Sequence, residues 1–112
     1  MKLSLFVLRC RDIEASKEFY ALFGCQFKEE MHGSGPKHYS CTHNNLTFEL
    51  YPMGKSATTD NVRLGFKVKN MRDTFYKCRD NDVTIEKNTH ERDGEKLFIV
   101  VDPDGRKVEI TE

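Results

Sequence analysis

Two glutamates, Glu49 and Glu109, are the carboxylates whose places in the sequence best suit chemistry. Each lies within an alternating run of apolar and polar residues, 46–51 and 106–111, that ends one half of the chain. Such alternation is typical of a strand with one face in the core, so each carboxylate would point to the opposite, more polar face. A carboxylate there could act as a general base, hold a divalent cation or orient a ligand.

Histidines are the residues that would complete a metal or acid–base site beside these carboxylates. The chain has four, all in or beside predicted loops: His32, His38, His43 and His90. None forms an H-x-x-x-H or H-E-x-x-H motif, so we expect exposed or loop-bonded side chains. His38 is the exception, because its strand could face a cleft and make it a third metal ligand with Glu49 and Glu109.

The cysteines show no spacing that predicts a site. They are Cys10, Cys25, Cys41 and Cys78. No two of them are separated by two residues, which is the spacing typical of zinc knuckles and redox pairs. We therefore expect four free, largely buried thiols in a reducing compartment.

Length and charge limit the classes of function. The chain has 112 residues, which fits one domain, and its 18 basic and 18 acidic residues give no net charge. No basic excess is present to neutralise phosphates, so a nucleic-acid partner is disfavoured, whereas self-association is permitted. No apolar run suits a membrane span, and Arg9 and Arg11 interrupt the apolar start too early for a signal peptide. We expect a cytoplasmic protein without a membrane partner.

Hydrophobic periodicity and turn residues predict the elements that would position these groups. Asp12 can cap a helix over residues 13–23, and Asn70 can cap a second helix. The turn at residues 102–105 predicts a hairpin near the end of the chain. The expected strands cover residues 3–10, 25–29, 37–42, 46–51, 62–68, 83–87, 95–101 and 106–111, with a polar loop at 89–94.

The two halves of the chain repeat the same order of strand, helix, strand and hairpin. The corresponding positions are Leu5 and Arg63, Asp12 and Asn70, Phe27 and Ile85, and Glu49 and Glu109. Repetition at this period predicts a duplicated unit whose apolar faces need each other. We therefore expect an α+β fold of two tandem βαβββ modules, 1–53 and 62–112, joined by a linker at 52–61 within one domain, 1–112.

Three motifs resemble the glyoxalase/bleomycin resistance protein/dioxygenase superfamily, also known for the vicinal oxygen chelate fold. Residues 12–24, with Asp12, Ser16, Phe19, Tyr20 and Gly24 in register, are similar to the family's first helix. Residues 48–52 resemble the end of its first module, and residues 101–110 resemble its final hairpin. The segment 32–39 is similar to small members as well. The resemblance spans essentially the whole chain and implies a curved mixed sheet that forms a cleft.

The resemblance also implies where a metal would bind. Enzymes of the family hold a divalent cation at places that fall here on Leu5, Glu49, Arg63 and Glu109. Leu5 has no donor atom and Arg63 is itself a cation, so the usual metal site is not expected. The two carboxylates would instead pair with Arg63 or orient a ligand. No cofactor is expected; a divalent metal held by Glu49, Glu109 and His38 is the lesser alternative.

A ligand cleft is the remaining expectation from the family. We expect its lining to comprise Leu5, Val7, Tyr39, Glu49, Tyr51, Arg63, Phe98 and Glu109. The three aromatic side chains would stack on a ring-bearing ligand or, alternatively, fill the core or a dimer interface.

Three functions remain open at this point. The first is a metal-free small-molecule binding protein that acts as a homodimer. The second is a lyase, isomerase or dioxygenase of the same superfamily, with Glu49 and Glu109 as the candidate base and its electrostatic partner. The third is a non-catalytic regulatory or scaffold domain.

Overall fold

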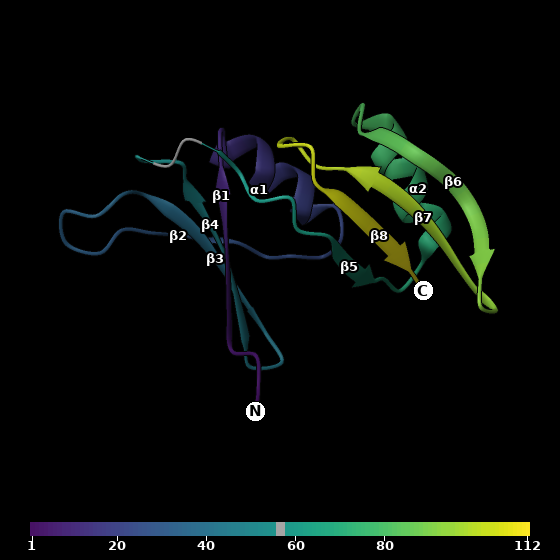
Figure 1. The fold of residues 1–112 in the computed structure, drawn as a ribbon, viewed down its shortest axis with the longest axis horizontal. Coiled ribbons are helices and arrows are strands. Elements are labelled where there is room, and N and C mark those ends of the chain that lie inside the picture. Colours follow the sequence, from purple (N-terminus) through teal and green to yellow (C-terminus); the bar gives the residue numbers. More distant parts are fainter. Residues whose placement is uncertain (56–57) are drawn as a thin grey trace.

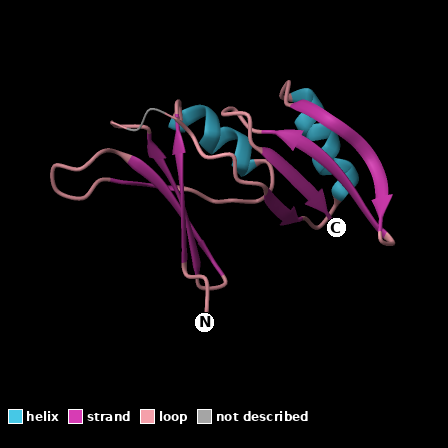
Figure 2. Cartoon of the chain, viewed as in Figure 1, coloured by secondary structure: helices cyan, strands magenta, loops and turns pink. Residues whose placement is uncertain are grey.

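The residues that the structure describes form eight strands and two helices in two similar halves (Figures 1 and 2). The computed structural model describes residues 1–55 and 58–112. The elements are β1 (Leu5–Cys10), α1 (Ile13–Ala21), β2 (Lys28–Glu30), β3 (His38–His43), β4 (Leu46–Pro52), β5 (Leu64–Lys67), α2 (Met71–Asp80), β6 (Thr84–Arg92), β7 (Glu95–Val101) and β8 (Lys107–Thr111).

Both helices begin where the sequence predicts. The Asp12 carboxylate accepts hydrogen bonds from the backbone N–H groups of Glu14 and Ala15, at 3.0 and 3.1 Å. The Asn70 side chain accepts one from Asp73, at 3.0 Å. These contacts satisfy backbone donors that have no partner within the first helical turn.

The strands form two separate four-stranded mixed sheets with the same order and register. Sheet one has the order β1-β4-β3-β2, and sheet two has the order β5-β8-β7-β6. In the parallel pairs, Val7 lies opposite Glu49 and Gly65 lies opposite Glu109. This register confirms the predicted equivalence of the two glutamates, and of Leu5 with Arg63. The α+β class and the two tandem modules are confirmed.

Helix α1 packs between the two sheets and joins them (Figure 1). The ring of Tyr20 meets Phe48 of sheet one edge-on at 5.2 Å and lies 5.8 Å from Phe66 of sheet two. Phe23 stacks on Phe66 at 5.5 Å. Helix α2 instead covers sheet two alone, where Phe75 meets Phe98. The aromatic side chains of α1 therefore hold the modules to each other.

A buried polar cluster adds to this junction. The Arg106 guanidinium has no exposed side-chain area and lies 3.0 Å from Asp102 Oδ2. It also donates hydrogen bonds to the backbone carbonyls of Arg9 and Asp60, two residues that lie outside the hairpin of Arg106. The Tyr20 hydroxyl donates to Asp102 at 2.6 Å. A buried carboxylate and guanidinium are tolerated here because both are paired and hydrogen-bonded.

Two strand predictions were wrong. The strand expected at residues 25–29 lies at Lys28–Glu30, because only these residues reach the neighbouring β3. The polar loop expected at residues 89–94 is mostly strand, since β6 continues to Arg92. Asp93 and Gly94, with φ of 53° and 81°, make the tight turn into β7. Polar composition misled here because β6 is an edge strand with much of its surface exposed.

Three other expectations concern the linker, the thiols and the membrane. The predicted linker, 52–61, includes Ser56 and Ala57, which lie outside the described residues. The four cysteines are free, and two of them, Cys10 and Cys78, are buried. Within residues 1–55 and 58–112, no helix has the length and apolar character needed to cross a membrane.

Candidate functional site

The candidate site is the face of sheet one that points away from α1. Phe48 contacts α1, so its neighbours on β4, Glu49 and Thr47, point to the opposite face. Leu5 and Val7 share this open face because they pair with Thr47 and Glu49. Leu5 is 52% exposed, and it begins β1. The open face therefore offers an apolar strip beside a carboxylate.

His38 is the most buried polar side chain on this face. It is only 1% exposed, although it stands at the start of β3. Its Nδ1 lies 3.1 Å from the backbone oxygen of Pro36. Its Nε2 lies 3.6 Å from Glu49 Oε2 and 3.7 Å from Glu30 Oε1. The imidazole is therefore held on one side by the backbone and faces two carboxylates on the other.

Tyr51 packs on His38 and completes this cluster. The two rings stack with centroids 4.1 Å apart and planes 11° apart, and the Tyr51 hydroxyl lies 3.3 Å from His38 Nε2. The Arg9 guanidinium lies 5.1 Å from the centroid of the Tyr51 ring, a cation–π distance. Tyr51 thus stacks on protein groups; the sequence left open whether it stacks on a ligand or packs within the protein.

Two further side chains approach His38 from β2 and the loop after it. Ligating atoms of Glu30, His32 and His38 all lie within 4.8 Å of one another. Glu30 and His38 face each other in the antiparallel pairing of β2 with β3. His32 is exposed in the loop, with its ring centroid 5.1 Å from that of His38. These residues could together hold a metal ion.

Sheet two carries a different cluster at the equivalent place. Arg92 binds both oxygens of Glu109, at 2.7 and 3.0 Å, and Arg63 binds Glu109 Oε1 at 2.9 Å. The hydrogen bonds from Arg92, with the added charge of Arg63, lower the pKa of the Glu109 carboxyl. Glu109 is therefore held as a carboxylate between two guanidinium groups.

Some of the predicted site residues are brought together, and others are kept apart. Arg63 pairs with Glu109 as expected, but Glu49 pairs with His38, so the idea that Arg63 binds both carboxylates is wrong. Glu49 and Glu109 belong to different sheets, and no contact joins their clusters among the described residues. Each carboxylate therefore has its own surroundings.

Tyr39 and Phe98 do not line the open faces, and their prediction as cleft residues was wrong. Phe98 is fully buried against Phe75 of α2. Tyr39 pairs with Leu50 on the helix-facing side of sheet one, and its hydroxyl donates to the Glu14 carboxylate at 2.7 Å. Successive residues of a strand point to opposite faces. Tyr39 follows His38, which lies on the open face, and Phe98 precedes Ile99, which pairs with Glu109, so Tyr39 and Phe98 both point to the core side.

The positions where the family's enzymes hold a metal do not form a donor set here. Leu5 has no ligating atom. Glu109 is already paired with the guanidinium groups of Arg63 and Arg92. It would have to give up both ion pairs in order to bind a cation. Glu49 lies on the other sheet. The residues at these four positions therefore do not fit a divalent cation.

Sequence reasoning missed Glu30 as a site residue, and it placed His32 in an exposed loop, as observed, without grouping it with His38. The sequence does contain a pattern that could have indicated this grouping: Glu30 and His32 precede a Gly-Ser-Gly-Pro loop, and His38 follows it. The motif went unrecognised because the strand was expected to end at residue 29, which left Glu30 outside the hairpin register. Metal ligands that face each other across a hairpin leave no fixed spacing in the sequence.

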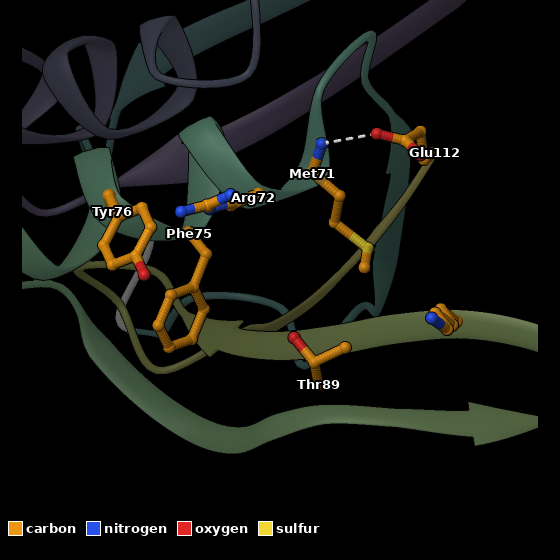
Figure 3. Close-up of a pocket in the computed structure, with 7 residues that line it drawn as sticks. Met71, Arg72, Phe75, Tyr76, Thr89 and Glu112 are labelled. Carbon is orange, nitrogen blue, oxygen red and sulfur yellow. Dashed lines mark hydrogen bonds between the residues drawn. The ribbon is translucent and has the colours of Figure 1, made fainter.

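A hollow of about 400 Å³ lies elsewhere, between α2 and the strands β6 and β7. Figure 3 shows Phe75 and Tyr76 of α2 on one side of it and Thr89 on the other. Met71, whose backbone N–H donates to the Glu112 carboxylate, stands at one end. None of the eight side chains expected to line the cleft lines this hollow.

Similar folds occur in proteins with different activities. The antibiotic-binding protein TnmS3 from Streptomyces sp. CB03234 superposes with a TM-score of 0.78 at 15% identity, over 99% of this chain and 94% of that one. A lactoylglutathione lyase from Agrobacterium tumefaciens gives 0.70 at 16% identity, over 99% and 92%. An integron cassette protein from the mobile metagenome of V. cholerae gives 0.73 at 22% identity, over 99% and 94%.

At these identities the structural similarity shows the fold alone, and no curated protein matches the sequence. The sequence model of one family, described as the glyoxalase/bleomycin resistance protein/dioxygenase superfamily, matches residues 2–110. This match covers nearly the whole chain and agrees with the paired βαβββ modules. The chain therefore belongs to the glyoxalase/bleomycin resistance protein/dioxygenase superfamily.

Proposed function

We propose that this protein binds a small organic molecule on the open face of sheet one, without the metal that the family's enzymes use. The proposal rests on the side chains at two equivalent positions, Leu5 and Arg63. Leu5 is an exposed apolar side chain, and Arg63 is ion-paired with Glu109 at 2.9 Å. Both positions favour contact with an organic ligand over coordination of a cation.

The chemistry of the open face indicates the class of ligand. Leu5 and Val7 offer apolar contact, and Glu49 beside them can accept a hydrogen bond or pair with a cationic group. A site with an apolar wall and few polar groups is typical of small-molecule binding. The antibiotic-binding protein TnmS3 has the same fold, which supports the idea that this fold can bind a small molecule.

A homodimer would complete the binding site. Glu49 and Glu109 belong to different sheets, with no contact between their clusters among the described residues, and β1 and β5 both lie at sheet edges. In a dimer, the Arg63 and Glu109 face of one chain could oppose the Leu5 and Glu49 face of the other. Zero net charge favours such self-association. We place this dimer in the cytoplasm, because four free cysteines suit a reducing compartment.

A thermal-shift screen of ring-bearing small molecules, with and without cationic groups, tests the proposal. A ligand at 100 times its Kd stabilises the native state by about 2.7 kcal/mol, which raises Tm measurably. The shift should be lost in Leu5→Asp, which charges the apolar strip. It should be retained in Lys96→Gln, a change on sheet two far from Leu5. A library that never shifts Tm, or shifts that Leu5→Asp leaves intact, would contradict the proposal.

Acid–base catalysis is the second candidate, and one contact favours it. Glu49 Oε2 lies 3.6 Å from His38 Nε2, so a carboxylate and an imidazole share one site. Molecules that pass the screen should be incubated with wild type and with Glu49→Gln, and followed by mass spectrometry for turnover. Catalysis through Glu49 requires turnover that the variant loses; full turnover in Glu49→Gln excludes it.

A further inference from the structure

The hydrogen bond of His38 to the backbone sets which of its nitrogens carries a proton. A carbonyl oxygen only accepts, so the 3.1 Å contact between Nδ1 and Pro36 O requires an N–H at Nδ1. In the neutral ring, Nε2 then carries a free lone pair. Metal-binding histidines commonly have this arrangement, in which a backbone carbonyl fixes the tautomer and the ring orientation. His38 is thus prepared to ligate through Nε2.

The groups around that lone pair are mostly acceptors. Glu30 Oε1 and Glu49 Oε2 lie 3.7 and 3.6 Å from Nε2, and only the Tyr51 hydroxyl, at 3.3 Å, can donate to it. The Glu30 and Glu49 side chains are 26% and 15% exposed, so the two carboxylates also reach solvent. A cation at this point would be shared by all three, so the cluster has the charge that favours one.

We propose that Glu30, His32 and His38 hold one divalent first-row transition-metal ion, such as Zn²⁺. Two imidazoles and a carboxylate form a donor set suited to such ions. Glu49, beside His38 Nε2, or a water molecule supplies the fourth position. The three ligands Glu30, His32 and His38 lie on β2, β3 and the loop between them, and none of them is at a position where the family's enzymes bind a metal; the two arrangements can share only Glu49.

The distances allow the site to close around an ion. Donor atoms at about 2.1 Å from a tetrahedral Zn²⁺ are about 3.4 Å from one another. The three donors lie within 4.8 Å of one another, so their separations must shorten by at most about 1.4 Å. His32 can provide this movement, because its side chain is exposed and Gly33 follows it with a φ of 58°. Glu30 and His38 are fixed by the strand pairing and supply the rigid part.

The site is specific to module one. Ser40 pairs with Glu49, and Ile99 pairs with Glu109, so His38 corresponds to Leu97 in module two. Leu97 is fully buried, which shows that this fold accepts a leucine at the position. His38→Leu therefore removes a ligand by substituting the residue that module two already has.

Metal binding by the full-length, untagged protein tests the inference. The protein is first stripped with a chelator, and Zn²⁺ is titrated against a chromophoric competitor. We expect one equivalent per chain. We expect His38→Leu, His32→Asn and Glu30→Gln each to weaken binding more than tenfold, since even groups behind the ligands typically change affinity by about 10- to 100-fold. His43→Asn, on the same strand but outside the cluster, should bind as wild type does.

Cobalt gives a second readout that does not depend on stability. Co²⁺ bound by nitrogen and oxygen ligands in a tetrahedral site should show visible d–d absorption without thiolate charge-transfer bands, and His32→Asn should lose this absorption. His32 is exposed, so its replacement is not expected to affect folding even if His38→Leu does. Absence of binding, binding unchanged in His32→Asn, or thiolate bands that point to a cysteine would each overturn the inference. None of these outcomes depends on an organic ligand.

Discussion

Module one and module two share strand order and register, yet their equivalent positions carry different chemistry. His38 in module one corresponds to Leu97 in module two, and Leu5 corresponds to Arg63. As a result Glu49 lies beside an imidazole, whereas Glu109 lies between two guanidinium groups. The same strand geometry therefore presents an available carboxylate in one module and a neutralised one in the other.

The turns of the two equivalent hairpins, β3–β4 and β7–β8, also carry different residues. In module one, Asn44 and Asn45 form an exposed turn with φ of 50° and 66°. In module two, the equivalent turn carries Asp102 and Arg106, which are buried at the module junction. Module two thus uses its charged groups for its own stability and for holding the modules together. Module one leaves its polar groups on an open face, where they can bind something else.

The largest effect is expected from Arg106→Leu, which gives module two the residue found at the equivalent Leu46. The change leaves Asp102 buried without its guanidinium, and removes the donors to Arg9 O and Asp60 O. Breaking a buried pair in this way typically costs about 3–5 kcal/mol. Chemical denaturation should show that loss in the free energy of unfolding.

Lys107→Met is the matched control for Arg106→Leu. It removes an ion pair with Glu86 in which both side chains are at least a third exposed, so the expected loss is under about 1 kcal/mol. Equal losses in the two variants would show that the Arg106 cluster is not a special feature of module two.

Tyr20→Phe should have the next largest effect, because it tests the link from module one to that cluster. Tyr20 of α1 stands where α2 has Cys78, and its hydroxyl donates a hydrogen bond to Asp102 at 2.6 Å. The variant keeps the ring and its aromatic contacts but loses a hydrogen bond to a carboxylate, worth about 1.5–3 kcal/mol. Denaturation of the single variants and of Tyr20→Phe with Arg106→Leu checks this.

The double variant decides whether Tyr20 and Arg106 act through the same carboxylate. Groups that share a partner show effects that do not add, with interaction energies of about 0.5–3 kcal/mol. Additive losses would mean that the junction depends on the two residues separately.

The sequence predicted the modules well because their signals are local. Asp12 and Asn70 are caps that act within a few residues, and the alternation of Leu46 to Tyr51 follows from one strand. The equivalence of Glu49 and Glu109 followed from the repeat. Each of these features depends on short-range periodicity, which a single sequence records directly.

The site was harder to predict because it depends on pairing between strands. Whether Glu30 faces His38 is decided by the register of β2 with β3, and a shift of one residue would turn each side chain to the opposite face. Arg92 was missed as a partner of Glu109 because it lies in a segment expected to be loop. Tyr39 and Phe98 were assigned by residue type, although strand alternation places them in the core.

Glu109→Gln tests the neutralised carboxylate of module two through pH. Hydrogen bonds from Arg92 lower the pKa of Glu109 in the folded protein. Its stabilising contribution is therefore fully present above the unfolded carboxyl pKa, about 4.3, and is lost as pH falls through the lowered folded pKa. At pH 7 wild type should exceed the variant by at most about 1 kcal/mol, because solvent screens the half-exposed arginines.

The difference between wild type and Glu109→Gln should then close as the pH falls below about 4. Denaturation curves at several pH values measure it. Glu14, whose pKa is also lowered, is present in both proteins and cancels from the comparison. A difference that stays constant down to acid pH would mean that the arginine contacts do not act through the charge of Glu109.

The smallest effect is expected from Arg63→Leu, which gives sheet two the apolar residue that sheet one has at Leu5. Arg63 is 48% exposed and makes one contact with Glu109, whereas Arg92 holds both carboxylate oxygens. The free energy of unfolding should therefore change by less than about 0.5 kcal/mol. Arg92→Leu should shift the acid limb of the stability curve more than Arg63→Leu does, since Arg92 is the main cause of the lowered Glu109 pKa. If Arg63→Leu has the larger effect, Arg63 rather than Arg92 neutralises Glu109, and the position equivalent to Leu5 accounts for the difference between the two faces.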